Sequence, residues 1–480
     1  MVLGSSSAPG GSAGYETYAG TTTVNNNGVI TFANSNVLPT GTDVIVGTET
    51  GIGTPTFNMN GFNQQIGSLS DGANVTATAH NLTITNNATG APATLTIGDS
   101  TTPANGSSAI IADGTSTVAL VKTGTDTITL KGNHNAFSGG VTVNQGTLTA
   151  TGAGALGTGA VTVNPTGTSG TAADAATLTT NTSAIGNSGS AFTVNTNSAT
   201  AIGTINFTSG SPTIGSLSGN GSAVLQSSTG TNLTIGSSAN NLSSTFSGAI
   251  SEATVGEGSI TKAGIGVLAL SGINTYTGAT TVTAGTLVVD GSISGSATTV
   301  QTGGALGGSG TVGGLSLQSG GTLAPGLEFS GESIKTLTAA GLTWNGGGTM
   351  NFELSASSNA SDLLSLSSSL GTGALTEGTA GTFQFNFLGG GEAGQTYDLV
   401  NFSSTNFSAS AFSATNLGSG LSANFELSGS ELQVQLQSVP EPSAWGALVW
   451  GVGILIGFRR FRQPGDRRVE ARRAITVSSL

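Results

Sequence analysis

The sequence contains no cysteine and, before residue 459, no arginine. Without cysteine, neither disulfides nor thiolate-bound metals can hold the fold together. Charged residues make up 7% of the 480 positions, and the remaining four basic residues are the scattered lysines Lys122, Lys131, Lys262 and Lys335. An acidic body without basic patches argues against nucleic acid as a partner.

Small and β-branched residues fill the rest of the chain. It holds 78 glycines and abounds in Thr, Ser, Asn and Val, and no long helix-forming window occurs before Pro442. β-branched residues suit a pleated sheet, while Gly and Asn suit the tight turns between strands. The composition predicts an all-β, repetitive protein.

A long segment that starts at Lys122 recurs from Lys262. The two copies share a Lys-x-Gly start, a Leu-x-Gly turn and an Asn. They also share an aromatic residue two positions before a Gly, and a closing Gly-Thr-Leu. Strands persist between the copies while the loops vary in length. Such repetition favours a solenoid over a sandwich or a barrel.

The alternation of apolar residues predicts the core of one turn. Leu268, Leu270 and Val282 share one parity, and Leu287 and Val289 take the other after an odd-length turn, so all five are expected to point inward. With about 20 residues per turn, each strand would pair with the strands above and below it.

The spacing Lys262-x-Gly264, continued to Gly285-x-Leu287, resembles the autotransporter-associated β-strand repeat. The first copy departs from that pattern at Asp126, where the pattern has Gly, and at Val141, where it has Thr. The resemblance implies a right-handed parallel β-helix in residues 21–326, a surface or secreted location, and no catalytic residues.

Residues 327–437 differ in composition from the rest of the chain, because they contain nine of the eighteen phenylalanines. Phe383, Phe385 and Phe387 alternate with polar residues, as do the apolar residues from Leu432 to Leu436, which indicates half-buried strands. We expect this segment to form a β-rich cap, because an open last turn would expose a sheet edge.

The carboxy-terminal tail contains a predicted sorting signal. Val439, Pro440, Glu441 and Pro442 precede an apolar run over 444–458, and an arginine cluster follows at Arg459, Arg460 and Arg462. This order resembles the PEP-CTERM signal, here 438–462, which implies a membrane helix over 444–458 and processing by an exosortase, an integral-membrane cysteine protease. Residues 463–480 are then a basic cytoplasmic tail.

The first twenty residues show neither a basic region nor an apolar stretch of a signal peptide. Because the tail implies export, we expect a start codon assigned too late or a truncated gene, and treat residues 1–20 as a disordered or truncated lead.

No catalytic, cofactor or metal residues are predicted. His80 and His134, the two histidines, both lie beside Asn in turn-like sequence, and the paired positions of Lys122 and Lys262 suggest a structural role. A polysaccharide lyase or hydrolase stays an alternative, since neighbouring turns could bring distant acids together. Thr-x-Thr pairs such as Thr127/Thr129 leave open an ice- or glycan-binding face.

The sequence therefore predicts a non-enzymatic, exported β-helix protein of the cell envelope, cell surface or extracellular matrix, structural or adhesive in role. Its expected partners are an exosortase, the membrane and surface glycans such as an exopolysaccharide. The membrane anchor is transient or retained.

Overall fold

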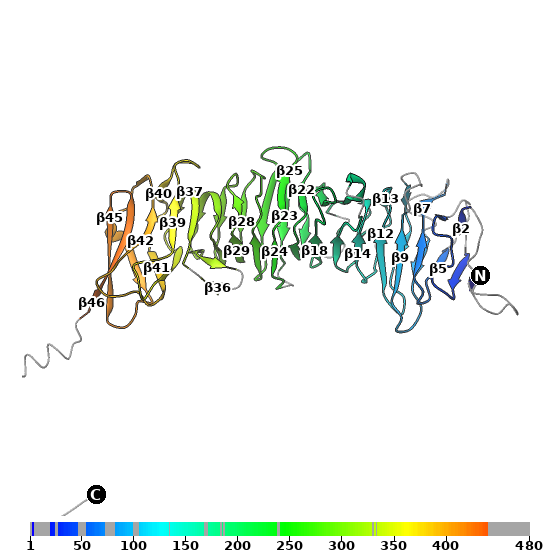
Figure 1. Ribbon diagram of the computed structural model, residues 1–480, viewed down its shortest axis with the longest axis horizontal. Helices are drawn as coiled ribbons and strands as arrows, with labels where there is room; N and C mark the ends of the chain where they lie inside the picture. The colour runs from blue at the N-terminus through cyan, green and yellow to red at the C-terminus, as the bar shows by residue number, and fades with distance from the viewer. Residues whose placement is uncertain are drawn as a thin grey trace, which may run out of the picture.

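The computed structural model of the 480-residue chain is a rod built from stacked turns of parallel strands (Figure 1). It describes Val2–Leu3 and residues 20–24, 27–46, 54–72, 82–98, 105–133, 135–167, 171–182, 185, 188–237, 241–328, 331–332 and 334–439. In these residues the regular structure is strand, apart from two 3-10 turns, η1 (Ala172–Asp174) and η2 (Ala409–Ala411). The predicted all-β class is confirmed.

One side of the rod, here called the spine, runs through most of the molecule. Its first part contains β6 (Gln64–Ile66), β9 (Ala93–Ile97), β12 (Val118–Lys122), β14 (Val141–Val143), β16 (Val161–Val163), β18 (Ala191–Val194) and β21 (Ser216–Ser218). Its second part contains β24 (Ser244–Phe246), β27 (Val267–Leu270), β29 (Gly285–Val289), β32 (Gly304–Gly308), β34 (Thr322–Pro325), β38 (Thr349–Leu354), β41 (Phe383–Gly389) and β44 (Phe412–Thr415). A parallel bridge between Gly219 and Phe246 joins the two parts.

Two further sides accompany the first part of the spine. The amino-terminal sheet contains β1 (Val2–Leu3), β3 (Val29–Phe32), β5 (Thr56–Asn58), β8 (Thr83–Thr85) and β11 (Ile110–Ile111). The threonine sheet contains β10 (Asn105–Ser107), β13 (Thr127–Leu130), β15 (Gly146–Ala150), β17 (Ala176–Thr180), β19 (Gly203–Phe207), β22 (Ser222–Leu225) and β25 (Ala249–Glu252), and β2 (Thr22–Val24), β4 (Asp43–Val46) and β7 (Ser68–Asp71) form a short sheet before it.

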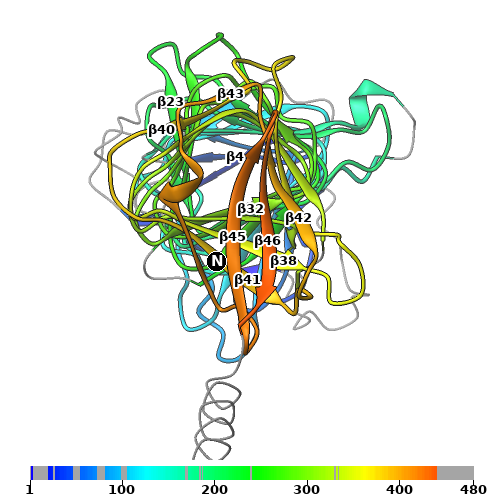
Figure 2. The same ribbon diagram turned by 90° about the vertical axis from the view of Figure 1, so that its left-hand side faces the viewer.

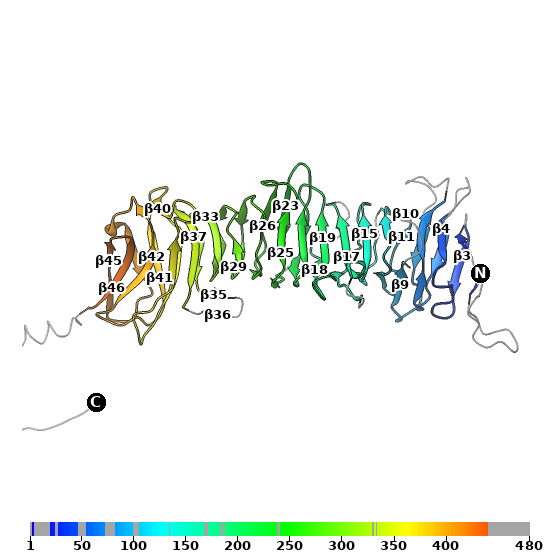
Figure 3. The same cartoon turned by 45° about the horizontal axis from the view of Figure 1, so that its top comes forward.

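The carboxy-terminal sheet faces the second part of the spine (Figure 3). Its parallel strands are β20 (Thr213–Ile214), β23 (Thr231–Ile235), β26 (Gly258–Lys262), β28 (Thr280–Val282), β30 (Ser292–Ile293), β31 (Thr298–Val300), β33 (Thr311–Leu317), β37 (Thr336–Trp344), β39 (Leu363–Leu366), β40 (Ala374–Glu377), β42 (Thr396–Asn401) and β43 (Ser404–Thr405). A small antiparallel pair, β35 (Leu327–Glu328) and β36 (Gly331–Glu332), stands apart from it.

The turns vary in length although the pairing is regular. Successive turns are 20 residues long where Thr261 pairs with Thr281, 17 where Thr299 pairs with Ser316, and 36 where Leu364 pairs with Val400. Extra residues form loops, while the strands keep their register. The expectation of about 20 residues per turn therefore holds within the repeats and fails in the turns with long loops.

The core is one narrow column inside the coil. The five apolar residues predicted to point inward between Leu268 and Val289 are all at most 1% exposed. Every second residue of a strand enters this column, as in the buried-intermediate alternation of β9, β12, β17 and β19. Burial of these side chains and the hydrogen bonds between turns hold the rod together.

The carboxy-terminal end is closed by aromatic residues and an antiparallel hairpin. Trp344 lies 5.4 Å from Phe383 and 5.3 Å from Phe385, measured between ring centroids. The hairpin of β45 (Leu421–Ser428) and β46 (Glu431–Ser438) pairs antiparallel with β42 and lies across the end of the coil (Figure 2). The hairpin caps the coil, because β46 occupies the edge of β42 with which a further turn would otherwise pair.

Parallel pairing crosses residue 326, since β34 pairs with β38. The division of the body at that residue stays a prediction, as does the right-handed sense of the coil. In the part of the chain that the structure describes, no helix has the length and apolar character to span a membrane. The helix predicted over 444–458 lies outside the described residues.

Candidate functional site

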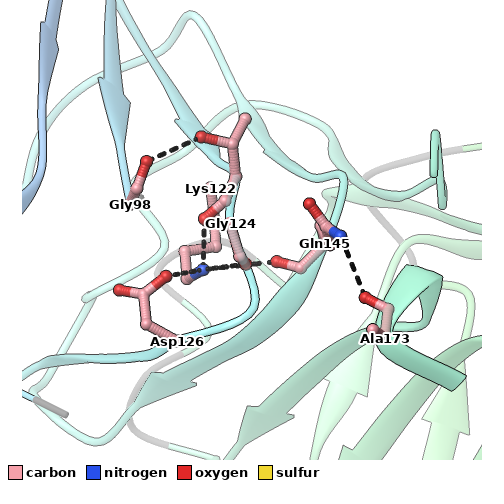
Figure 4. Close-up of polar contacts among 7 residues, drawn as sticks. Gly98, Lys122, Gly124, Asp126, Gln145 and Ala173 are labelled. Atoms are coloured by element: carbon pink, nitrogen blue, oxygen red, sulfur yellow. Dashed lines mark hydrogen bonds and ion pairs between the residues drawn. The ribbon is translucent and has the colours of Figure 1, made fainter. Parts of the chain in front are cut away.

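The first repeat buries a lysine at the corner between β12 and β13. Lys122 is 1% exposed, and its Nζ donates hydrogen bonds to the carbonyl oxygens of Thr123, Gly124 (2.8 Å) and Gln145 (3.3 Å) (Figure 4). The Asp126 carboxylate lies 2.9 Å from the same nitrogen, and its side chain is 3% exposed. The corner is thus a buried ion pair tied to the next turn of the coil.

The second repeat builds the same corner without the acid. Lys262 is 2% exposed and donates to the carbonyl oxygens of Ala263 (2.7 Å), Gly264 (2.8 Å) and Ala284 (3.2 Å). Gly266 stands at the position of Asp126, and a Cβ there would lie 2.2 Å from the Leu242 carbonyl oxygen. Burial without a counter-charge lowers the pKa of Lys262 to about 8.

A buried asparagine clamps three turns in each repeat. Asn135 accepts a hydrogen bond from the Ile111 amide (2.8 Å) and donates to the Ala155 carbonyl (2.9 Å). Asn274 accepts from the Ile250 amide (2.9 Å) and donates to the Ser292 carbonyl (3.1 Å). Both side chains therefore replace backbone hydrogen bonds at a corner where strands end.

The aromatic position differs between the copies. Phe137 of the first copy is fully buried, and Val141 follows four residues later. In the second copy the Tyr276 hydroxyl pairs with Thr280 Oγ1 at 2.7 Å, which in turn lies 2.7 Å from Ser296 Oγ. Burial, against these hydrogen bonds, raises the pKa of Tyr276 to about 12, so the phenol stays neutral.

A carboxylate precedes the first strand of each repeat and ties it to the following turn. Asp113 accepts from the amides of Val118 (2.8 Å) and Ser138 (3.0 Å). Glu252 accepts from the amides of Gly258 (2.7 Å) and Thr277 (3.0 Å). Burial raises the pKa of Glu252, but the hydrogen bonds from Thr277, Gly258 and Gly256 outweigh it and hold the pKa below its ordinary value.

The outer surface of the threonine sheet carries two columns of threonines in register. Strand pairing aligns Thr127, Thr147, Thr177 and Thr204 in one column, and Thr129, Thr149, Thr179 and Asn206 in the other. The uneven sequence spacing of these Thr-x-Thr pairs conceals the alignment, because loops of different length separate the strands.

The carboxy-terminal sheet carries a longer hydroxyl column. We call it the hydroxyl ladder: it consists of Thr213, Thr234, Thr261, Thr281, Thr299, Ser316, Thr343 and Thr376, aligned by consecutive parallel pairings. Its last four members line a groove of about 480 Å³, whose floor contains Gly314 and Gly341 and whose wall is Leu370–Thr372.

The two repeats do not face the same way. The first strand of the first copy, β12, lies in the spine, and its second strand, β13, lies in the threonine sheet. In the second copy the first strand, β26, lies in the carboxy-terminal sheet and the second, β27, lies in the spine. The repeat is therefore turned by one side of the coil between the copies.

Most of the residues predicted to act as a signal lie outside the described residues. Of the sorting residues, Val439 is described: it is 48% exposed and its amide donates to the Gly420 carbonyl at 2.7 Å. Pro440, Glu441, Pro442 and the arginine cluster Arg459, Arg460 and Arg462 are not described, and neither are His80 and His134. Within the described ranges no three His, Cys, Asp or Glu side chains gather as a metal site would require.

The two repeat segments match a known family. Residues 120–150 and 260–289 match the family model described as Passenger-associated-transport-repeat. These ranges start two residues before the two buried lysines and end at the last residues of β15 and β29. The two copies of the repeat are therefore similar to passenger-associated transport repeats.

Curated relatives share short segments with this chain. It is 49% identical over 87 residues to Adhesin BmaC autotransporter of Brucella suis biovar 1 (strain 1330), a match that covers 18% of this chain and 2% of that protein. It is 46% identical over 71 residues to Extracellular serine protease of Serratia marcescens, covering 15% of this chain and 7% of that protein. The chain thus spans a small fraction of the length of these relatives.

Among solved structures, that of the Haemophilus influenzae Hap adhesin aligns with 87% of this chain and 57% of its own, at 13% identity and a TM-score of 0.28. The parallel coil of this chain is defined by its own strand pairing.

The two lysine positions were predicted from the sequence. The asparagine clamps, the carboxylates of Asp113 and Glu252, and the groove were not. The recurrence of Asn135 and Asn274 at one repeat position was an available signal. The carboxylates gave none, because one is Asp113, outside any strand, and the other is Glu252, at the end of β25. The groove depends on the register of Gly314 with Gly341, which no local pattern reveals.

Proposed function

We propose that this protein is an exported, non-enzymatic rod of the cell surface or extracellular matrix, with a structural or adhesive role. The observation that carries the proposal is the pair of passenger-type repeats built into one parallel coil. The similarity of part of the chain to an autotransporter adhesin agrees with it. In both repeats the buried lysine and the buried asparagine bond the coil's own backbone, as expected of architecture.

In this proposal the carboxy-terminal tail directs the export and processing of the protein. Val439, Pro440, Glu441 and Pro442 form the recognition stem of a PEP-CTERM signal, 444–458 is its membrane helix, and the arginine cluster holds the end in the cytoplasm. An exosortase then processes the chain, and the body reaches the envelope or the matrix.

Surface localisation in the native host tests this route. Combined Pro440→Ala, Glu441→Ala and Pro442→Ala changes should leave the protein unprocessed in the membrane fraction, while the Arg467→Ala/Arg468→Ala control should reach the surface. Immunofluorescence on intact cells and fractionation measure both. Unchanged surface display of the triple variant would reject the sorting proposal.

The carbohydrate-active enzyme alternative predicts turnover. Reducing-sugar and unsaturated-product assays on a polysaccharide panel measure it, and activity abolished by a single acid or lysine substitution would replace the structural role with an enzymatic one.

A further inference from the structure

The groove on the carboxy-terminal sheet is an uncharged, partly apolar recess at the end of the hydroxyl ladder. Its fifteen lining residues include no acid, base or aromatic residue. Its volume of about 480 Å³ falls in the range of small-molecule sites, roughly 300–1,000 Å³. A charged ligand would lose its hydration here without gaining a counter-charge, so the lining selects for a neutral ligand.

The shape of the groove is fixed by the fold. Gly314 and Gly341 pair in register and leave the outer face of the sheet without side chains at its floor. The wall is anchored, because the Gly373 amide donates to the Ala340 carbonyl at 2.8 Å and Ser403 Oγ donates to the Thr372 carbonyl at 2.6 Å. The recess is therefore preformed, which lowers the ordering cost of binding.

The polar groups of the groove are hydroxyls that lie in a line. Thr299, Thr343 and Thr376 make no hydrogen bond through their hydroxyls within the described part of the chain, whereas Ser316 Oγ accepts one from Gln318 Nε2 (2.7 Å). Each free hydroxyl can donate and accept. Alanine and leucine side chains, among them Ala297 and Leu370, supply the apolar contacts beside them.

The ladder repeats once per turn of the coil, at about 4.8 Å, so its eight members extend over roughly 34 Å along the rod. A ligand that uses it must be extended, neutral and rich in hydroxyl groups at a similar repeat, with C–H faces for the apolar side. An extended chain of neutral pyranose sugars has these properties.

We propose that the groove and the hydroxyl ladder bind a neutral polysaccharide chain laid parallel to the axis of the rod. The proposal deepens the proposed surface role by naming a ligand class. It is tested on purified protein, so its outcome is separate from that of localisation: surface display without glycan binding rejects this proposal alone, and glycan binding without surface display rejects the other.

Binding of the full chain, purified in a detergent without a sugar headgroup, is measured by calorimetry against neutral oligosaccharides of two to six sugars. The panel contains β-1,4-glucan, chitin, xylan, mannan and β-1,3-glucan fragments, with alginate oligomers as the charged comparison. At least one neutral series should bind, with an affinity that rises with chain length, and alginate should not bind.

Gly314→Tyr places a ring in the groove. A Cβ at Gly314 meets no atom within 4 Å, so the strand accommodates it. We expect affinity to fall tenfold or more, while Thr149→Tyr, which adds the same ring to the threonine sheet, leaves it unchanged.

The triple change Thr299→Val, Thr343→Val and Thr376→Val keeps the side-chain shape and removes the hydroxyls. It should reduce affinity by about tenfold or more, since each hydroxyl that is removed takes away one hydrogen bond to the ligand. The matched control is Thr127→Val, Thr147→Val and Thr177→Val on the threonine sheet. Absence of binding across the neutral panel, preferential binding of alginate, or equal losses in test and control variants would overturn the proposal.

Discussion

The two copies of the repeat differ in the residues that surround their buried lysine. Both bury a lysine at the corner after the first strand and bond it to backbone carbonyls of two turns. In the first copy Asp126 neutralises the charge, whereas in the second Gly266 lets the Leu242 carbonyl approach where the acid would lie. The corner therefore requires the lysine but tolerates either completion.

The aromatic position shows the same kind of exchange. Tyr276 in the second copy comes with Thr280 and Ser296, which satisfy its hydroxyl, while Phe137 comes with Val141, which needs no partner. The two departures of the first copy from the repeat pattern, Asp126 and Val141, are thus matched to their surroundings. Both substitutions leave the buried lysine and the buried aromatic residue of the first copy in place.

Removal of the first lysine should have the largest effect on stability. Lys122→Met leaves the Asp126 carboxylate buried without its counter-charge, which costs about 3–5 kcal/mol. Urea denaturation and hydrogen exchange in β12–β15 measure the loss. The double variant Lys122→Met/Asp126→Leu should recover part of it, and a double variant as unstable as the single one would contradict the ion-pair account.

The same change in the second copy should cost less. Lys262→Met leaves carbonyl oxygens without a donor but strands no charge, so we expect about 1–3 kcal/mol. Hydrogen exchange in β26–β29 gives the comparison. A loss equal to that of Lys122→Met would show that Asp126 contributes nothing to the difference between the corners.

Exchange of the aromatic residues should have unequal results. Phe137→Tyr buries a hydroxyl beside Val141 and should cost about 1–3 kcal/mol, while Tyr276→Phe removes one hydrogen bond and should cost about 1 kcal/mol. Adding Val141→Thr to Phe137→Tyr should restore part of the stability. Thermal unfolding measures all three variants. If Val141→Thr gives no rescue, the buried tyrosine hydroxyl does not depend on a threonine partner.

The pH dependence of the free energy of unfolding should show the smallest difference between the two corners. The pKa of Lys262 is about 8 in the folded protein and about 10.4 in the unfolded chain, so between these values the unfolded state binds the extra proton. Stability should therefore rise as the pH increases from about 8 to about 10. The melting temperature of the wild type should follow this rise, and that of Lys262→Met should lack it; parallel profiles would refute the assignment.

The sequence predicted what depends on local pattern. Alternation over Leu268, Leu270 and Val282 placed these residues in the core, and the repeated Lys-x-Gly start indicated a structural lysine. Both follow from the period of a strand and from the scarcity of charge, which makes each lysine conspicuous.

The rest depends on register between distant turns. The rotation of the repeat by one side results from the turns between the copies, such as the 31 residues from Thr162 to Thr193, whose lengths carry no visible rule. The hydroxyl ladder likewise joins residues at spacings from 17 to 33, from Thr299–Ser316 to Thr343–Thr376. A single sequence contains no signal for such alignment.

The central claim is that one coil continues through both repeats, so that the side holding β12 goes on to hold β27. Because the chain has no cysteine, an engineered pair reports the contact directly. Ser218 and Thr245 lie on neighbouring turns where the spine continues, one residue before the bridged pair Gly219 and Phe246. Under mild oxidation Ser218→Cys/Thr245→Cys should form an intramolecular disulfide, and Ser218→Cys/Thr234→Cys should not. A disulfide in the second pair and none in the first would contradict the account.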